Sequence, residues 1–261
     1  MYYYIFEQPR NSNDRKVHDK IRLALETNRI YGENSVASPA RSADELTEMG
    51  FNKGATTIVA VGSDRHINRI VNTIKLLERG LNRNVVLGVI PTDLESSIKE
   101  RLRLNTLEDA CDALKKRRYT TVTLGYIEGV RYFLTTAEIH SATPIKISIR
   151  ADRWQSSHEI TDFVIFSDLT FSFYNSLASK KGLGKLFAWM TGSQSGAEEI
   201  SIFHGRTLQV SSGVILPVTI EGEAVTKTPF IVYKMPKALK VIIKRDKFIK
   251  EENHEEKLSN N

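Results

Sequence analysis

Four consecutive residues, Gly62-Ser63-Asp64-Arg65, have the types and spacing expected of a phosphate-binding turn. The tetrad follows the apolar run Ile58 to Val61 and leads directly into a helical stretch from His66 to Arg79. A strand that ends in small residues and opens into a helix presents free backbone N–H groups and the positive end of the helix dipole. Arg65 and His66 are nevertheless large, where close backbone approach favours glycine. The pattern indicates phosphate chemistry, or an architecture retained from it.

Three carboxylates lie in expected turns and could take part in phosphate chemistry. Where a phosphoryl group is transferred, a carboxylate is needed that orients or deprotonates the attacking hydroxyl. Asp64 lies within the tetrad, where it could equally serve as the N-cap of the following helix. Glu221 and Glu223 flank Gly222 in an expected turn, and the alternative for them is a solvated turn without catalytic function. The sequence alone leaves these alternatives open.

Two further carboxylates would repel a phosphate at this turn. Asp93 and Glu95 follow the expected strand Val85 to Ile90, and we expect their loop to lie near the tetrad. A close like-charge pair costs about 1 kcal/mol in water and several times more in a partly dry cleft. Arg65 and Arg69 could supply compensating positive charge to a phosphate, or they could be ordinary surface residues.

Composition narrows the classes of protein that the chain can belong to. The 261 residues include 41% hydrophobic and 26% charged residues, which is typical of a folded globular chain, and the net charge of +6 favours anionic partners. Cys111 is the only cysteine, and the first residues lack the pattern of a secretion signal, so we expect a cytoplasmic protein. No apolar run is long enough to cross a bilayer, so membrane association would be peripheral. The scattered histidines do not predict a transition-metal site, and no nucleic-acid-binding signature is present.

The spacing of apolar residues along the chain changes near Lys116. Before it, short apolar runs alternate with amphipathic stretches, which predicts βα units; after it, two-residue alternation predicts strands. Ser42 to Glu45 reads as a helix capping box, and Gly80 is placed to end the helix after the tetrad. We therefore predict an α/β nucleotide-binding domain over residues 1–116, a β-rich domain over 117–243 and a charged, disordered tail over 244–261.

One segment of the second half has two interpretations. Leu186 to Met190 lies beside Lys180, Lys181 and Lys185, and could be a membrane-surface element with basic flanks. Such an apolar stripe is more often packed in a core, and we favour the core.

The motifs, taken in order, resemble those of the diacylglycerol kinase catalytic family, which groups with sphingosine kinases and more distantly with NAD kinases. Family members carry Gly-Gly-Asp-Gly-Thr and then Leu-Asn-Glu at the tetrad, of which this chain keeps Gly62, Asp64 and Asn68. Their second motif, Ile-Pro-x-Gly-Thr-Gly, is represented by Ile90-Pro91, with Asp93 and Glu95 in place of glycines. The later part has close counterparts of three family motifs, in Tyr132-Phe133-Leu134, Glu221-Gly222-Glu223 and Met235-Pro236-Lys237-Ala238-Leu239-Lys240-Val241.

The resemblance covers about residues 2 to 243 and implies a fold, an activity and a site. The implied fold is a Rossmann-like α/β lobe followed by a β-rich sandwich lobe, with the ligand in the cleft between them. The implied activity is ATP- and Mg²⁺-dependent phosphoryl transfer to a lipid hydroxyl. It assigns catalysis to Asp64, Glu221 and Glu223, and nucleotide binding to Gly62, Ser63, Arg65 and Asn68, although Asn68 could be merely an exposed first-turn residue.

Three functions remain open at this stage. The first is a divergent lipid kinase, whose partners are a nucleotide and a lipid or membrane surface. The second is a kinase-fold protein without catalysis, serving as a lipid-binding or regulatory module, because most phosphate-loop glycines are missing. The third, an NAD kinase, is disfavoured because the Pro236 to Val241 segment is of the lipid kinase type. We expect no nucleic-acid partner, and a homodimer is left open.

Overall fold

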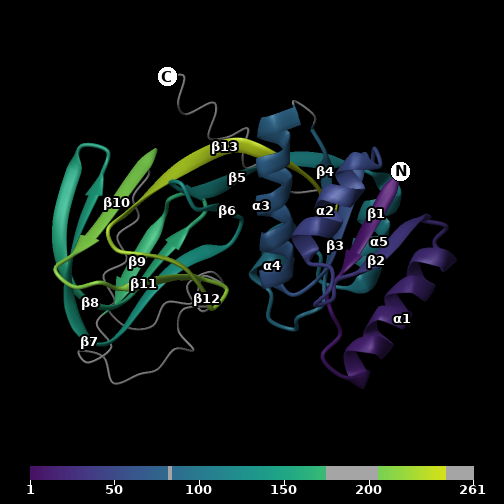
Figure 1. The fold of residues 1–261 in the computed structure, drawn as a ribbon, viewed down its shortest axis with the longest axis horizontal. Helices are drawn as coiled ribbons and strands as arrows, with labels where there is room; N and C mark the ends of the chain where they lie inside the picture. The colour runs from purple at the N-terminus through teal and green to yellow at the C-terminus, as the bar shows by residue number, and fades with distance from the viewer. Residues whose placement is uncertain (82–83, 175–204, 245–261) are drawn as a thin grey trace. The chain divides into compact units, whose positions relative to one another are not determined.

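The computed structural model describes residues 1–81, 84–174 and 205–244, and it divides into two compact units (Figure 1). Unit 1 comprises Met1–Val122 and the chain from Leu239 onward, and unit 2 comprises Thr123–Ala238. The boundary crosses two strands, β5 (Tyr119–Ile127) and β13 (Phe230–Ile242). The last residues of β13 belong with unit 1 because Lys240 and Val241 pair with a strand of that unit.

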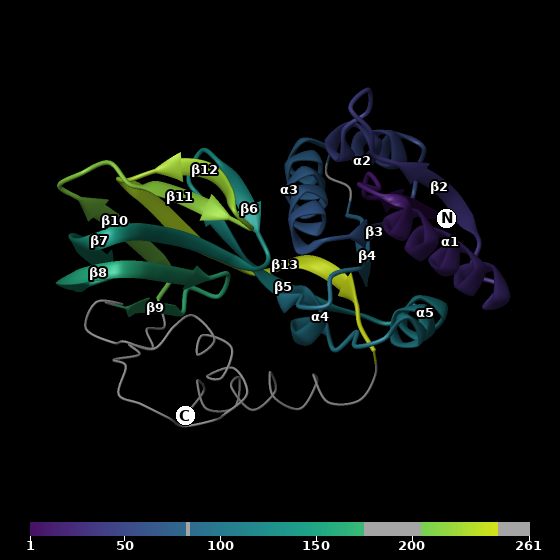
Figure 2. The same ribbon diagram turned by 90° about the horizontal axis from the view of Figure 1, so that it is seen from below.

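Unit 1 is an alternation of strands and helices, as the sequence predicts. Its parallel sheet has the order β13-β4-β3-β1-β2. Helices α2 and α3 cover one face and α1 and α5 cover the other (Figure 2). The bounds are β1 Tyr2–Phe6, α1 Ser12–Thr27, β2 Gly32–Val36, α2 Ala43–Asn52, β3 Thr57–Gly62, α3 Asp64–Leu81, β4 Val86–Pro91, α4 Ser97–Leu102 and α5 Leu107–Lys116.

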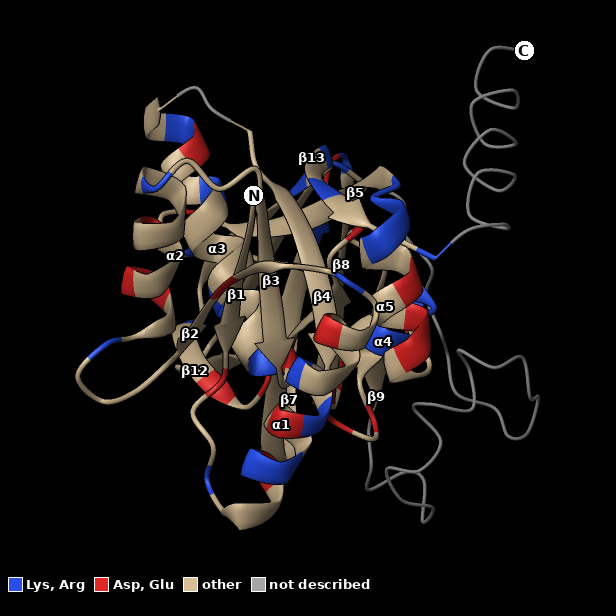
Figure 3. Ribbon diagram, turned by 90° about the vertical axis from the view of Figure 1, so that its right-hand side faces the viewer, with Lys and Arg blue, Asp and Glu red and all other residues tan. Residues whose placement is uncertain are grey.

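The central strands of unit 1 are apolar on both faces. Figure 3 shows charged residues on the helices and none on β1, β3 or β4, as expected for parallel strands that are covered on both sides. In register, Phe6 pairs with Val61, and Gly62 pairs with Pro91. The carboxyl ends of these three strands therefore meet at one edge, which is where ligands bind in open α/β sheets.

Local signals explain where the helices begin. The predicted capping box of α2 is present, with Ser42 and Glu45 each accepting the other's backbone N–H. Helix α3 buries Ile67, Ile70 and Ile74 against the sheet, which confirms the expected apolar face. It continues through Gly80 to Leu81, so the prediction that Gly80 ends the helix was wrong. Glycine costs helix stability without forbidding helical geometry.

Unit 2 is built from antiparallel strands in its described part. Strand β13 pairs with β10, β10 with β7, β7 with β11, and β11 with β12. The long hairpin of β7 and β8 carries β9 on its other side. The bounds are β6 Arg131–Phe133, β7 Thr136–Ala151, β8 Trp154–Phe166, β9 Phe171–Tyr174, β10 Thr207–Ser212, β11 Pro217–Ile220 and β12 Glu223–Lys227.

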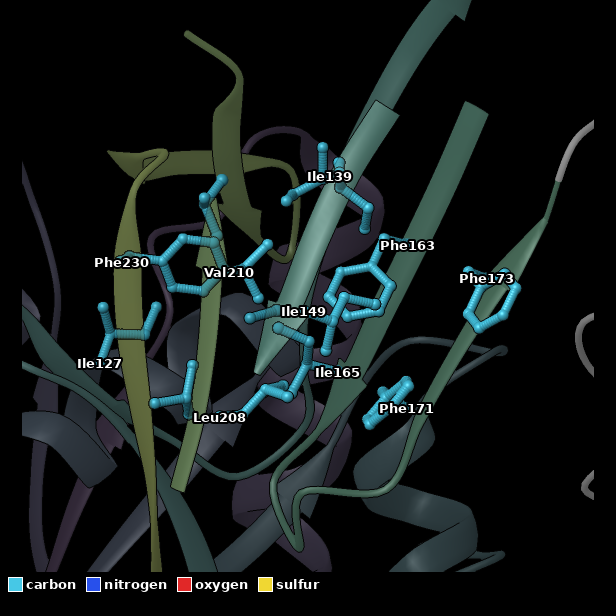
Figure 4. Packing of buried hydrophobic residues seen from close by; sticks show 14 of the residues in the cluster. Ile127, Ile139, Ile149, Phe163, Ile165, Phe171, Phe173, Leu208, Val210 and Phe230 are labelled. Carbon is cyan, nitrogen blue, oxygen red and sulfur yellow. The ribbon is translucent and has the colours of Figure 1, made fainter. Parts of the chain in front are cut away.

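The core of unit 2 comes from the inward-facing positions of these strands. Phe163 and Phe171 pack at a centroid distance of 5.5 Å, and isoleucines of β7 and β8 surround them (Figure 4). Alternating burial at both ends of β7 is what the two-residue sequence period predicts, whereas the second half of β8 is buried at consecutive positions.

Two sequence predictions lie outside the described residues: the apolar segment Leu186 to Met190 with its flanking lysines, and the tail beyond Lys244. Within the described part of the chain, no helix has both the length and the apolar character needed to cross a membrane.

Candidate functional site

The tetrad forms the junction between β3 and α3, at the carboxyl edge of the sheet. The Ser63 hydroxyl accepts a hydrogen bond from the backbone N–H of His66 at 3.3 Å, and the Ser63 carbonyl accepts one from Ile67 at 3.0 Å. These are the bonds of a helix N-cap. Ser63 therefore caps α3, and the expectation that Asp64 could be that cap was wrong.

The carboxylate of Glu7 occupies the turn. It accepts the backbone N–H of Ser63 at 2.7 Å and the Ser63 hydroxyl at 2.9 Å. A Cβ placed on Gly62 would lie 2.7 Å from the Glu7 Cβ and 2.8 Å from its Oε2, so the glycine permits this close approach. An anionic oxygen pair thus lies where the sequence predicts phosphate oxygens.

Glu7 stays ionised in this position. Burial alone would raise the pKa of its carboxyl, but the two hydrogen bonds from Ser63, together with the bond from Arg10, outweigh burial and lower the pKa below its ordinary value. The Arg10 guanidinium lies 3.1 Å from Oε1, the oxygen that also accepts the Ser63 hydroxyl. The turn therefore holds a charged internal anion.

Asp64 is buried and bonded to the next loop. Its side chain, in a residue only 4% exposed, accepts hydrogen bonds from the hydroxyls of Ser96 and Ser97 and from the backbone N–H of Ile98. The Ser97 distance is 2.9 Å and the Ile98 distance is 3.2 Å. These bonds tie the turn after β3 to the start of α4.

Asp93 approaches the turn as the sequence predicts. Its carboxylate accepts the backbone N–H of Asp64 in a long, weak hydrogen bond of 3.4 Å. Burial raises the pKa of Asp93, and the nearby Asp64 and Glu7 charges add to the rise, while the Asp64 N–H and Arg10 oppose it. Successive backbone N–H groups of the turn therefore each face a carboxylate. Glu95, like Asp93, is exposed to solvent.

Four other residues in or just after the turn differ in their burial and in their contacts. His66 is buried, with Nε2 3.0 Å from the Ile5 carbonyl, and burial lowers its pKa, so the neutral ring donates this bond. Asn68 is only 2% exposed, contrary to the alternative of an exposed first-turn residue. Arg65 is exposed, and Arg69 lies 3.3 Å from the Asp44 carboxylate.

Solved structures share this fold. The crystal structure of a diacylglycerol kinase from Bacillus anthracis str. Sterne superposes with a TM-score of 0.70, covering 93% of this chain and 96% of its own at 14% identity. Two more structures from that organism, assigned provisionally to the same enzyme class, give TM-scores of 0.69 and 0.72, at 14% and 12% identity. They likewise cover 93% of this chain, and 96% and 97% of their own.

The chain has the diacylglycerol kinase fold. The predicted fold class, an α/β lobe and a β-rich lobe, is thereby confirmed. At the level of sequence, no protein-family model and no curated protein matches the chain significantly.

In this diacylglycerol kinase fold, Glu221 and Glu223 belong to unit 2. Glu221 and Gly222 form the two-residue turn between β11 and β12, with φ angles of 50° and 71°. This is the positive-φ pattern of a hairpin turn in which a bulky first residue is uncommon. Glu223 starts β12, and its carboxylate lies 3.5 Å from the Arg131 guanidinium.

The donor set of the turn suits a phosphate. Two consecutive N–H groups at the start of α3 already bind carboxylate oxygens, so Glu7 acts as an internal stand-in for a ligand anion. No group of three or more potential metal ligands occurs among the described residues. Mg²⁺ is commonly held by one or two carboxylates plus substrate phosphates, so Asp64 and Asp93 are the residues next to the turn that could take part.

Sequence reasoning missed Glu7, Ser96 and Ser97. Glu7 is separated from Ser63 by 56 positions, and it reaches the turn because β1 lies beside β3. The available signal was an acidic residue directly after a buried strand. Ser96 and Ser97 precede a short helix, where hydroxyl residues are expected as caps, but their bonds to Asp64 required the tertiary fold.

Proposed function

We propose that the chain is a divergent lipid kinase that transfers a phosphoryl group from ATP to a lipid hydroxyl. The observation that carries the proposal is the anion-holding turn at the carboxyl edge of β1, β3 and β4, in a chain with the diacylglycerol kinase fold. A turn whose backbone N–H groups bind carboxylate oxygens has the donors that a phosphate needs.

The residues of the turn have distinct proposed roles. Ser63 and Gly62 supply the N–H groups and the close approach, and Arg65 and Asn68 complete the nucleotide site. Bound ATP with Mg²⁺ would supply the phosphoryl group and the charge neutralisation that transfer requires. Asp64, held in one orientation by Ser96, Ser97 and Ile98, is the carboxylate next to the reacting groups.

Glu7 opposes nucleotide binding at the turn. A nucleotide must displace the Glu7 carboxylate from Ser63, and must approach Asp93, before its phosphates reach both N–H groups. Each close like-charge pair costs about 1 kcal/mol in water and more where water is excluded. We therefore expect weak affinity for ATP. The carboxylates Glu221 and Glu223 remain the proposed second catalytic pair.

The lipid acceptor is expected at a membrane surface, with the protein bound peripherally. The purified full chain should phosphorylate diacylglycerol in mixed vesicles with Mg²⁺-ATP, with sphingosine and NAD tested as other acceptors. Asp64→Asn should lower the rate by about a hundredfold or more, as for loss of a catalytic carboxylate. Glu26→Gln, an exposed site on α1, should leave the rate unchanged. Phosphorylation of NAD alone would replace the lipid proposal with an NAD kinase.

A second candidate is a kinase-fold protein without catalysis that binds lipid or regulates a partner. The occupation of both turn N–H groups by the chain's own carboxylates favours it specifically. It predicts no phosphorylation of any acceptor, no nucleotide binding even at millimolar ATP, and equal behaviour of the wild-type protein and Asp64→Asn in binding lipid vesicles. Any Asp64-dependent turnover excludes it.

A further inference from the structure

A cavity of unit 1 lies beside the β4–α4 loop, next to the sheet edge just described. It has a volume of about 190 Å³ and is enclosed by α1, the end of β4, the start of α4 and α5. Figure 2 shows α1 and α5 on the same side of the strands. Neither Glu7 nor Ser63 lines it.

The wall of this cavity is mostly apolar. Ile21, Ile90, Leu104 and Ala110 contribute to it, and each is no more than 3% exposed. Leu94 also lines the cavity, although 93% of its surface is accessible to solvent. An exposed leucine beside a hollow with a buried apolar wall is what a binding pocket offers to an apolar ligand.

Two lysines, Lys20 from α1 and Lys99 from α4, line the same cavity. Lys20 is exposed and Lys99 is half-buried, so their stems can lie along the apolar wall while the ammonium groups stay in water. Neither forms an ion pair with any described residue. The one carboxylate in the lining is Asp93, which also accepts the long hydrogen bond from the Asp64 N–H, so two lysines against one carboxylate leave the lining with a net positive charge.

We propose that this cavity binds a small monoanion with a short apolar body, of the class of medium-chain carboxylates. The apolar wall takes the hydrocarbon, and the two lysines select a negative head over a neutral or positive one. An apolar protein cavity of about 150 Å³ accepts benzene, so this cavity suits a body of about that size. The cavity shares Asp93 with the surroundings of the turn but includes neither Ser63 nor Asp64, so binding of the monoanion needs no nucleotide.

The test compares three ligands of the same length by titration of the full chain, followed through backbone amide signals in the NMR spectrum. Hexanoate should shift the signals of Leu104, Ala110 and their neighbours in α1. Hexanamide should bind about threefold more weakly, as expected for loss of partly exposed charge pairs, and hexylammonium more weakly still.

Variants assign the selectivity to the two lysines. Lys20→Gln with Lys99→Gln should make hexanoate and hexanamide bind equally. In contrast, Lys16→Gln with Lys115→Gln, exposed on α1 and α5 outside the cavity lining, should keep the wild-type preference. Ala110→Leu should reduce binding of all three ligands by filling the cavity. Equal binding of the three ligands to the wild-type protein, or shifts confined to other regions, would overturn the proposal.

Discussion

Glu7 accepts both the backbone N–H and the hydroxyl of Ser63, at 2.7 Å and 2.9 Å. The two residues follow neighbouring parallel strands, β1 and β3, so the sheet register brings them together. A carboxylate thus satisfies the donors that the turn would otherwise present to a ligand. The turn therefore has the geometry that binds an anion, but its donors are already bonded to a side chain of the protein and are not open to an anion from solution.

The buried His66 predicts a pH-dependent stability. Burial lowers its pKa from the ordinary 6.5, so the unfolded chain binds the proton more tightly than the folded one. The stability from the neutral ring is fully present above about pH 6.5 and is lost as the pH falls through the lower folded-state pKa. The free energy of unfolding in urea should therefore fall between about pH 7 and 5, and His66→Gln should flatten the fall. Equal slopes for both proteins would contradict the assignment.

The three hydrogen bonds to Asp64 predict a difference between two substitutions. Asp64→Asn puts an amide group where the Ser96, Ser97 and Ile98 donors converge, so it should lower the free energy of unfolding by about 1–3 kcal/mol. Ser97→Ala removes one donor and keeps the carboxylate, so it should cost about 0.5–1.5 kcal/mol. Urea denaturation of both variants measures this. A larger loss for Ser97→Ala than for Asp64→Asn would show that these bonds do not position Asp64.

Much of unit 1 follows from local patterns. The capping box at Ser42, the apolar face of α3 and the apolar runs of β1, β3 and β4 are properties of neighbouring residues, and each was predicted. The edge at which the strands end was also predictable, because parallel strands joined by helices all point the same way. The acidic character of the β4–α4 loop at Asp93 came from the sequence directly.

The side chains that bond to the turn were not predictable from local patterns. Glu7 is bonded to Ser63 across 56 positions, and Asp64 to Ser97 across 33, so both contacts depend on strand order and register. Asn68 is buried because its side of α3 is covered. The spacing of apolar residues along the helix predicts which apolar positions are buried, but it does not predict the burial of a polar residue. Polar residues that bond across loops leave no periodic signal.

The close packing of Phe133 against Gly125 in unit 2 predicts that a larger residue at position 125 destabilises the protein. A Cβ at this position would lie 2.2 Å from the Cζ of Phe133, which is fully buried. Gly125→Ala must displace that ring, and overpacking of this kind costs about 1–3 kcal/mol. Gly80→Ala, with open space around the site in α3, should be neutral or slightly stabilising because alanine favours helix. Thermal denaturation of the two variants tests this, and equal melting temperatures would contradict the predicted clash.

The central claim is that the phosphate-binding turn is intact but filled by Glu7. Titration of Mg²⁺-ATP into the full chain by calorimetry tests this most directly, with Glu7→Gln compared with wild type and with Glu26→Gln, a charge-matched exposed control. Removing one close like charge is worth about 1 kcal/mol or more, so Glu7→Gln should bind at least about fivefold more tightly, and Glu26→Gln should match wild type. Unchanged or weaker binding by Glu7→Gln would contradict the claim.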